Sequence, residues 1–137
     1  MTDYRGQHAA PGYEPDGSTA PLHDVSGLIP DFYEKSHQYR ISHEPGEAQA
    51  MDLMHQFRGR RKGQIRVYRA IPSDVAVKRG QGIQRGDWVT PVRSYALEHG
   101  RIHLSNQFRI VSKMVPPKHL FTEANSWEEW GYDPTAP

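Results

Sequence analysis

Proline is concentrated in the first third of this chain, and its distribution limits where regular structure can form. Five of the eleven prolines and five of the twelve glycines lie within residues 1–46, where no helical or strand period persists. Because proline fixes φ and lacks an N–H donor, this stretch cannot supply a central strand or a long helix. It also carries many large apolar and aromatic side chains, which a solvated tail would not. We expect an ordered, loop-rich wrap over residues 1–46, with residues 1–3 frayed.

Length and composition exclude several classes of protein. A chain of 137 residues fits one domain spanning residues 1–137. The absence of cysteine excludes disulfides, thiolate zinc sites and a cysteine nucleophile. A formal net charge of +1 indicates neither nucleic acid nor a membrane as the main partner. No apolar run approaches the roughly 20 residues of a membrane span, and residues 1–10 lack the apolar stretch of a signal peptide. We expect a cytoplasmic protein.

A helical period follows the wrap. Residues 46–58 read GEAQAMDLMHQFR, and four apolar side chains recur at positions i, i+3, i+4 and i+7: Ala50, Leu53, Met54 and Phe57. Pro45 suits the first helical turn, and Gly59 suits the C-terminal end. We expect an amphipathic helix over 46–58 whose apolar face packs in the core rather than forming a binding groove.

A basic run, RGRRKGQIR at residues 58–66, comes next. Clusters of lysine and arginine grip phosphate groups, so Arg60, Arg61 and Lys62 are candidate contacts to nucleic acid. A solvated turn between helix and strand accounts for the same residues. The low net charge favours the turn.

Residues 65–71 (IRVYRAI) predict a strand, because β-branched and aromatic residues dominate and Pro72 ends the run. Alternation places Ile65, Val67 and Arg69 on the inner face. An inward guanidinium needs an anionic partner or a cleft, because an unpaired buried charge is costly. An arginine at the end of the strand would instead reach water. The sequence leaves both interpretations of Arg69 open.

The next segment predicts a loop, a short strand and a short helix. Three glycines punctuate the loop without matching a P-loop or a dinucleotide-binding motif: Gly80, Gly82 and Gly86. Asp87–Val89 can form a short strand. Thr90 followed by Pro91 is a good helix start, and Gly100 is a typical C-terminal residue. We expect a helix over 91–99.

The last third predicts a second full strand and then a pair of carboxylates between tryptophans. Residues 108–115 (FRIVSKMV) read as a strand, and residues 120–133 mix a short strand with a turn. Glu128 and Glu129 are adjacent, so an extended backbone points them to opposite faces. In one interpretation both glutamates are solvated while the tryptophans pack; in the other, Glu129 is functional.

Eight histidines raise a metal hypothesis that their spacing does not favour. His99 and His103 are four residues apart, but we expect Gly100 to end the helix that would place them on one face. Neither an HExxH metal motif nor a GxSxG nucleophile motif occurs. We expect no metal site.

Several short segments occur in a recognisable order along the chain. They are YRGQH at 4–8, VYRA at 67–70, GDWVTP at 86–91, YALEHG at 95–100, LFT at 120–122 and EWGY at 129–132. In this order and spacing the chain resembles mono-ADP-ribosyltransferase domains of the Arg-Ser/Thr-Glu type, above all the ADP-ribosyltransferase-like domains of phage and mobile-element (polyvalent) proteins. The resemblance implies an α+β fold, with a small split antiparallel β-sheet core and a few short helices around a cleft that binds NAD.

The resemblance also implies roles for three residues. NAD would be the substrate, cleaved between ribose and nicotinamide through an oxocarbenium-like state in which positioning and electrostatics dominate. Arg69 would contact the phosphates or ribose of NAD. Thr90 would orient Arg69 and the ribose, although a plain helix cap explains it equally well. Glu129 would be the catalytic residue, accepting a hydrogen bond from the ribose 2′-OH and stabilising positive charge on the sugar.

Three aromatic residues complete the expected NAD-binding set. Tyr95 and Trp88 are candidates to stack on nicotinamide, and Tyr68 lies within the same motif as Arg69. Two departures from the family pattern stand out. The second segment reads WVT where Ser-Thr-Ser is usual, and Trp127 stands two residues before Glu129, where Glu or Gln is frequent, so the acceptor is undefined.

These observations favour a mono-ADP-ribosyltransferase that acts as a phage or mobile-element effector. It would transfer ADP-ribose from NAD to a host protein side chain or nucleic acid and release nicotinamide. Two alternatives stay open: a non-catalytic interaction module on the same fold, and a nucleic-acid-binding domain that uses residues 58–66.

Overall fold

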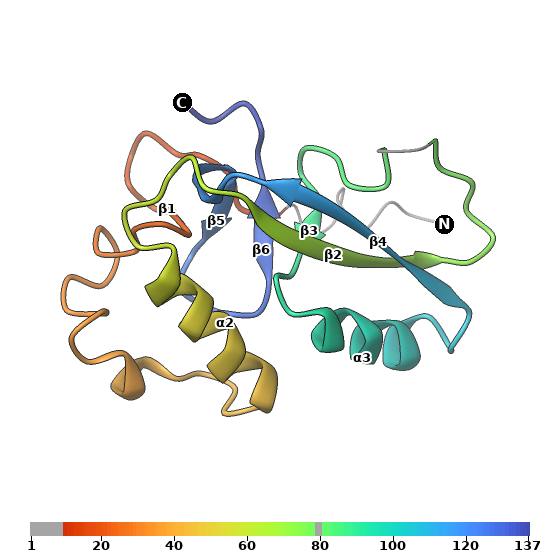
Figure 1. Cartoon of the computed structure of the whole chain (residues 1–137), viewed down its shortest axis with the longest axis horizontal. Coiled ribbons are helices and arrows are strands. Elements are labelled where there is room, and N and C mark those ends of the chain that lie inside the picture. The colour runs from red at the N-terminus through yellow and green to blue at the C-terminus, as the bar shows by residue number, and fades with distance from the viewer. Residues whose placement is uncertain (1–9, 79–80) are drawn as a thin grey trace.

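The computed structural model describes residues 10–78 and 81–137. Within these ranges the fold combines two antiparallel sheets with two α-helices, α2 (Pro45–Gln56) and α3 (Arg93–His103) (Figure 1). One sheet has the strand order β1-β5-β6-β3: β1 (Ala20–Pro21), β5 (Leu120–Thr122), β6 (Trp130–Tyr132) and β3 (Trp88–Val89). The other pairs β2 (Ile65–Pro72) with β4 (Phe108–Val115). This mixed architecture is compatible with the expected α+β class.

A single residue pair bridges the two sheets. The Tyr68 N–H donates to the Thr90 carbonyl at 2.8 Å, and the Thr90 N–H donates to the Tyr68 carbonyl at 3.0 Å. Thr90 directly follows β3, so the bridge fixes the position of the β2–β4 pair relative to the four-stranded sheet.

The helix predicted over 46–58 is confirmed as α2. Pro45 stands in its first turn, and Ala50 and Met54 of the predicted apolar face are fully buried. Gly59 adopts φ +76° just beyond the helix, and its N–H donates to the His23 carbonyl at 2.9 Å. The helix itself ends at Gln56, and glycine adopts this left-handed conformation without a steric cost in the turn that follows.

Both long strands are confirmed. β2 and β4 pair in antiparallel register from Ile65 opposite Val115 to Pro72 opposite Phe108. The basic run before β2 forms turns, as the low net charge favoured. Two of its arginines make contacts within the chain. The Arg58 guanidinium lies 4.2 Å from the ring centroid of Tyr33, and Arg61 Nη2 donates to the Pro137 carbonyl at 3.0 Å.

The helix predicted over 91–99 is wrong at both ends. Val92 keeps an extended backbone and serves as the N-cap of α3, so Thr90 is not the cap that its sequence context suggested. The Thr90 hydroxyl instead accepts the Val92 N–H at 3.1 Å, in the turn before the helix. At the other end, α3 continues through Gly100 to His103. Gly100 is buried against Phe108, whose ring an added Cβ would overlap, so glycine serves close packing here rather than helix termination.

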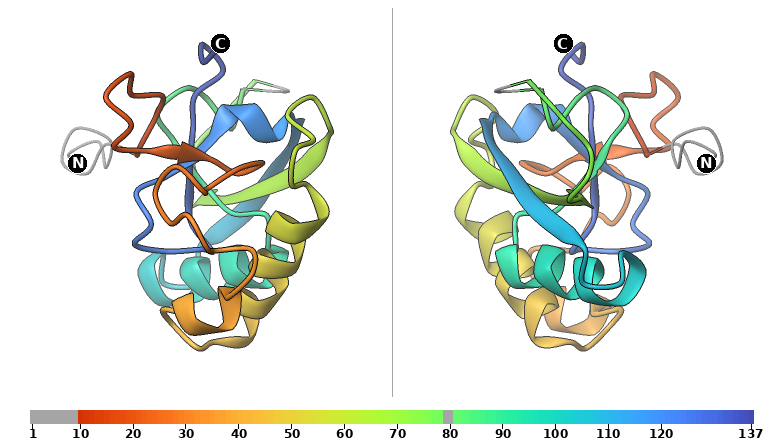
Figure 2. Two further views of the ribbon diagram at one scale, coloured as in Figure 1. Left: turned by 90° about the vertical axis from the view of Figure 1, so that its left-hand side faces the viewer. Right: turned by 90° about the vertical axis from the view of Figure 1, so that its right-hand side faces the viewer.

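The N-terminal wrap is ordered over its described part, residues 10–46. Leu22, Val25 and Phe32 are fully buried, and β1 adds an edge strand to the sheet by pairing with β5. Figure 2 shows this orange segment running from β1 around to the start of α2. An edge position suits a strand that ends in proline. The expected fraying of residues 1–3 and the YRGQH segment at 4–8 lie outside the described residues.

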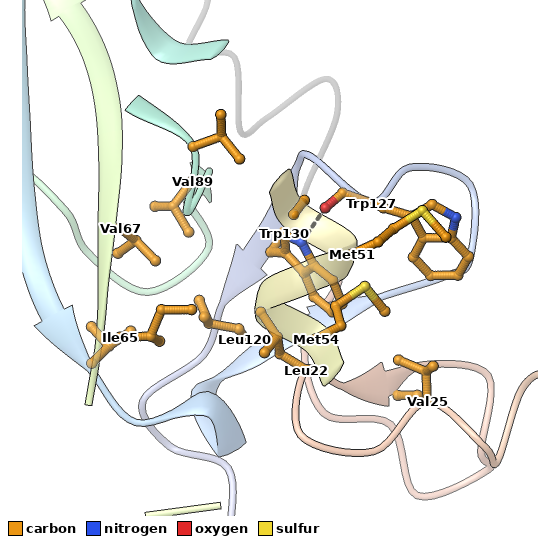
Figure 3. Close-up of a cluster of buried hydrophobic side chains, with 14 of the residues drawn as sticks. Leu22, Val25, Met51, Met54, Ile65, Val67, Val89, Leu120, Trp127 and Trp130 are labelled. Atoms are coloured by element: carbon orange, nitrogen blue, oxygen red, sulfur yellow. Dashed lines mark hydrogen bonds between the residues drawn. The ribbon is translucent and has the colours of Figure 1, made fainter. Parts of the chain in front are cut away.

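The core lies between α2, the four-stranded sheet and β2 (Figure 3). Its largest fully buried side chains are those of Trp127 and Trp130, and Trp130 Nε1 donates to the Trp127 carbonyl at 2.8 Å. Burial of two indoles on either side of residues 128 and 129 holds that short segment firmly in place. Neither described helix has the length and apolar character to cross a membrane.

Candidate functional site

Glu129 lies immediately before β6, on a segment that side chains hold from both sides. The Ser126 hydroxyl accepts the N–H groups of Glu128 and Glu129, each at 3.2 Å. Trp127 Nε1 donates to the Tyr39 carbonyl at 2.7 Å, so the wrap also anchors this segment. The Glu129 side chain is left partly exposed.

Tyr95 and Glu129 are in direct contact. The Tyr95 hydroxyl donates to Glu129 Oε1 at 2.5 Å, from the first turn of α3. A charge-assisted hydrogen bond of this kind is stronger than a neutral one and fixes the orientation of the carboxylate. Two residues that the sequence placed in one site are therefore neighbours. Whether Tyr95 also stacks on nicotinamide stays a prediction.

Arg69 has an anionic partner. Its Nη1 lies 3.9 Å from Asp87 Oδ2, and the side chains are 25% and 3% exposed, respectively. Asp87 Oδ2 also accepts the Gln84 N–H at 2.7 Å. The inner-face interpretation of Arg69 therefore holds, with a carboxylate that sequence reasoning did not assign to it. At 3.9 Å this ion pair is long, and Arg69 offsets the charge of a buried carboxylate that would be costly to leave uncompensated.

Thr90, Tyr68 and Trp88 are placed mainly through the backbone. Tyr68 and Thr90 form the bridge between the sheets, and Thr90 is buried with its hydroxyl engaged by Val92. Trp88 pairs in β3 with Gly131, two residues beyond Glu129. Trp88 therefore lies on the strand that pairs with β6, and Tyr68 is joined to that strand's end through Thr90. The contacts of all three residues with a ligand stay predictions.

His99 and His103 belong to this region, although sequence reasoning set them aside. Because α3 does not end at Gly100, the two rings meet at a centroid distance of 4.7 Å. Tyr95, His99 and His103 are spaced four residues apart, which places them on one face of a continuous helix. The expected helix end at Gly100 excluded that arrangement from the sequence prediction.

Electrostatics connect His99 with both halves of the site. Burial and the neighbouring His103 lower the pKa of His99 below its ordinary value of 6.5. Arg69 also lowers this pKa, and Glu129 opposes the shift. Both charged residues therefore lie within electrostatic range of His99, which is neutral at pH 7.

Glu128 is not solvated, and the backbone at residues 127 and 128 forms a bend rather than the extended segment on which the expected alternation depends. The Glu128 side chain is buried, and Oε1 accepts the Ser42 hydroxyl at 2.8 Å. Burial raises the pKa of Glu128 above its ordinary value, and the carboxylates of Glu47, Glu129 and Glu44 add to the effect. The interpretation in which both glutamates are solvated is wrong for Glu128.

Within residues 10–78 and 81–137, no group of three or more histidine, aspartate or glutamate side chains could hold a metal ion. The region instead combines a carboxylate fixed by a tyrosine, a neutral imidazole and a paired guanidinium. Such a set can stabilise positive charge at a carbon centre while it binds an anionic ligand.

Comparisons with protein-family models, curated proteins and solved structures give no match to this chain.

Proposed function

We propose that this protein is a mono-ADP-ribosyltransferase that transfers ADP-ribose from NAD to a host protein side chain or nucleic acid. One observation carries the proposal: three of the six segments that resemble the family lie side by side. The Tyr68–Thr90 bridge joins VYRA to GDWVTP, and the Trp88–Gly131 pair joins GDWVTP to EWGY. Nothing in the local sequence requires these segments to be neighbours, so their adjacency supports a shared site with an NAD cleft.

In this proposal Glu129 supports the developing charge on the sugar. When the bond between ribose C1′ and the nicotinamide nitrogen breaks, nicotinamide leaves as a neutral molecule with the bonding electrons and C1′ becomes cationic. A carboxylate held by the Tyr95 hydroxyl is oriented before the reaction, and preorganised charge of this kind lowers the barrier most effectively. The acceptor then forms a bond to C1′ and releases its proton.

Arg69 would hold the substrate rather than take part in bond breaking. Its guanidinium presents a planar set of donors that suits phosphate oxygens. Binding of a diphosphate would add charge-assisted hydrogen bonds to the guanidinium, which keeps its 3.9 Å contact with Asp87. Thr90, Tyr68, Trp88 and Tyr95 would line the remainder of the NAD site.

The test compares wild type with Glu129→Gln, incubated with labelled NAD and a bacterial lysate while nicotinamide release and labelled acceptors are measured. We expect the variant to lose activity by about 100-fold or more, because Gln keeps the shape but removes the charge. Glu98→Gln is the matched control, because Glu98 is exposed on the same helix as Tyr95 and pairs with Arg101.

Two results would contradict the proposal. Equal rates for wild type and Glu129→Gln would remove the catalytic role of Glu129. An absence of NAD binding by calorimetry would remove the enzyme and favour the non-catalytic interaction module instead.

A further inference from the structure

Four residues of the loop between β2 and β3 line a hollow of about 210 Å³ together with β4: Val77, Lys78, Gly82 and Ile83. Figure 1 shows this green loop above the β2–β4 pair, with α3 below the pair. Gly82 makes the close approach possible, because a Cβ there would lie 2.9–3.0 Å from side-chain atoms of Val111. Any larger residue would push the loop away from the strand and open the hollow.

Three cationic side chains from two separate segments line this hollow. Lys78 comes from the loop, whereas Arg109 and Lys113 come from β4. Residues 109, 111 and 113 share one face of the strand by alternation, so both β4 cations flank Val111. Cations from distant parts of the sequence therefore converge on one hollow.

These cations have no carboxylate partner within residues 10–78 and 81–137. Arg109 Nη2 donates to the Val75 carbonyl at 2.5 Å, which ties the loop to the strand. Lys113 Nζ lies 5.1 Å from the ring centroid of Tyr132, a cation–π contact that leaves its charge uncompensated. Among the described residues, no acidic side chain lines the hollow.

This concentration of charge is local. The whole chain carries a formal net charge of only +1, yet three positive groups gather in one small hollow without counter-charges. A bound anion would offset the positive potential of the hollow. Arginine offers a planar fork and lysine a point charge, a combination that suits the oxygens of a phosphate group.

We propose that the hollow between β4 and four loop residues, Val77, Lys78, Gly82 and Ile83, binds a small phosphate-bearing molecule, with Lys78, Arg109 and Lys113 contacting its phosphate oxygens. A diphosphate, free or as part of a nucleotide, is the chemical class. Neither Arg69 nor Glu129 lines the hollow, so the inference stands independently of the proposed transferase activity.

The test is a titration of the full chain with pyrophosphate, followed by calorimetry and by the amide NMR signals of Gly82 and Val111. We expect saturable binding that weakens as salt is added. Lys113→Gln and Lys78→Gln should each weaken it about tenfold, as the loss of one charge-assisted contact implies. Lys78 is exposed, so its substitution leaves folding intact.

A matched control separates this hollow from general basicity. Lys62→Gln removes an exposed charge from the basic turn and should bind pyrophosphate as wild type does. An equal loss in Lys62→Gln, or no saturation at millimolar pyrophosphate, would each overturn the proposal. Titrations with phosphate and with ADP distinguish a free anion from a nucleotide. The proposal would also be contradicted if duplex DNA bound more tightly than pyrophosphate and its affinity did not change in Lys113→Gln.

Discussion

Glu47 is a buried charge whose role is structural. Its carboxylate accepts the N–H groups of Ile41, Ser42 and His43 at 2.6, 2.8 and 2.9 Å and pairs with Arg40 Nε at 3.2 Å. Burial alone would raise its pKa, but these hydrogen bonds outweigh burial and lower the pKa below the ordinary value of 4.5. The loop that they hold carries Ser42, which bonds to Glu128 beside the candidate site. One side chain thus orders part of the wrap.

Glu47→Gln should destabilise the protein by about 2–3 kcal/mol at pH 7, because it removes the charge that satisfies buried donors. The lowered pKa of Glu47 means that its contribution is present above 4.5, the unfolded value, and is lost as the pH falls through the lower folded value. The deficit should therefore shrink in acid. Urea denaturation at several pH values measures it, with the exposed Glu98→Gln as control. A deficit that does not change with pH would contradict the charge-based explanation.

Some helices and strands are determined by residues within the element itself, and others by packing against distant parts of the chain. α2 was predictable because its apolar period and terminal residues lie within the element, and β2 and β4 carry enough β-branched residues to be read directly. α3 was misjudged because the packing of Phe108 decides what Gly100 does. The contact of His99 with His103 could not be predicted for the same reason, because it forms only when the helix continues through Gly100.

Gly100→Ala tests that explanation. Helix propensity alone predicts a gain of about 1 kcal/mol from replacing a glycine within a helix by alanine. We expect a loss of about 1–3 kcal/mol instead, because the new methyl group would overlap the Phe108 ring. Thermal or chemical unfolding measures the sign. In a Phe108→Leu background the loss should diminish, and a gain in the single variant would show that the ring gives way freely.

At the scale of the whole molecule, the pairing of distant segments around the candidate site could not be predicted from the sequence. The strands of the larger sheet have only two or three residues each, too short for any periodicity to give their register. The Tyr68–Thr90 bridge and the Asp87 partner of Arg69 likewise arise from chain segments that meet only in the folded state. The candidate site could be named from motif resemblance, but its contacts could not.

Gly131→Ala should severely destabilise the fold, by about 3 kcal/mol or more, because its Cβ would overlap the Pro11 carbonyl where the wrap crosses β6. That carbonyl belongs to the backbone and cannot rotate away as a side chain does. Gly27→Ala is the control, since an added Cβ there meets nothing within 4 Å. Circular dichroism melting curves of both variants check the prediction, and similar stabilities would contradict the close approach of wrap and strand.

The pairing of Ala20 with Thr122 has a consequence for how the chain folds as it is synthesised. Chains emerge N-terminus first, yet β1 has no partner until β5 has followed it. Three apolar side chains of the wrap cannot be buried until the rest of the core has been made: Leu22, Val25 and Phe32. That core includes Trp127 and Trp130. Contacts between such distant parts of a chain form slowly, so a nascent chain exposes these apolar side chains until residues 120–132 have been made. Folding of residues 10–46 therefore waits for the synthesis of β5 and β6, and aggregation competes with it in the meantime.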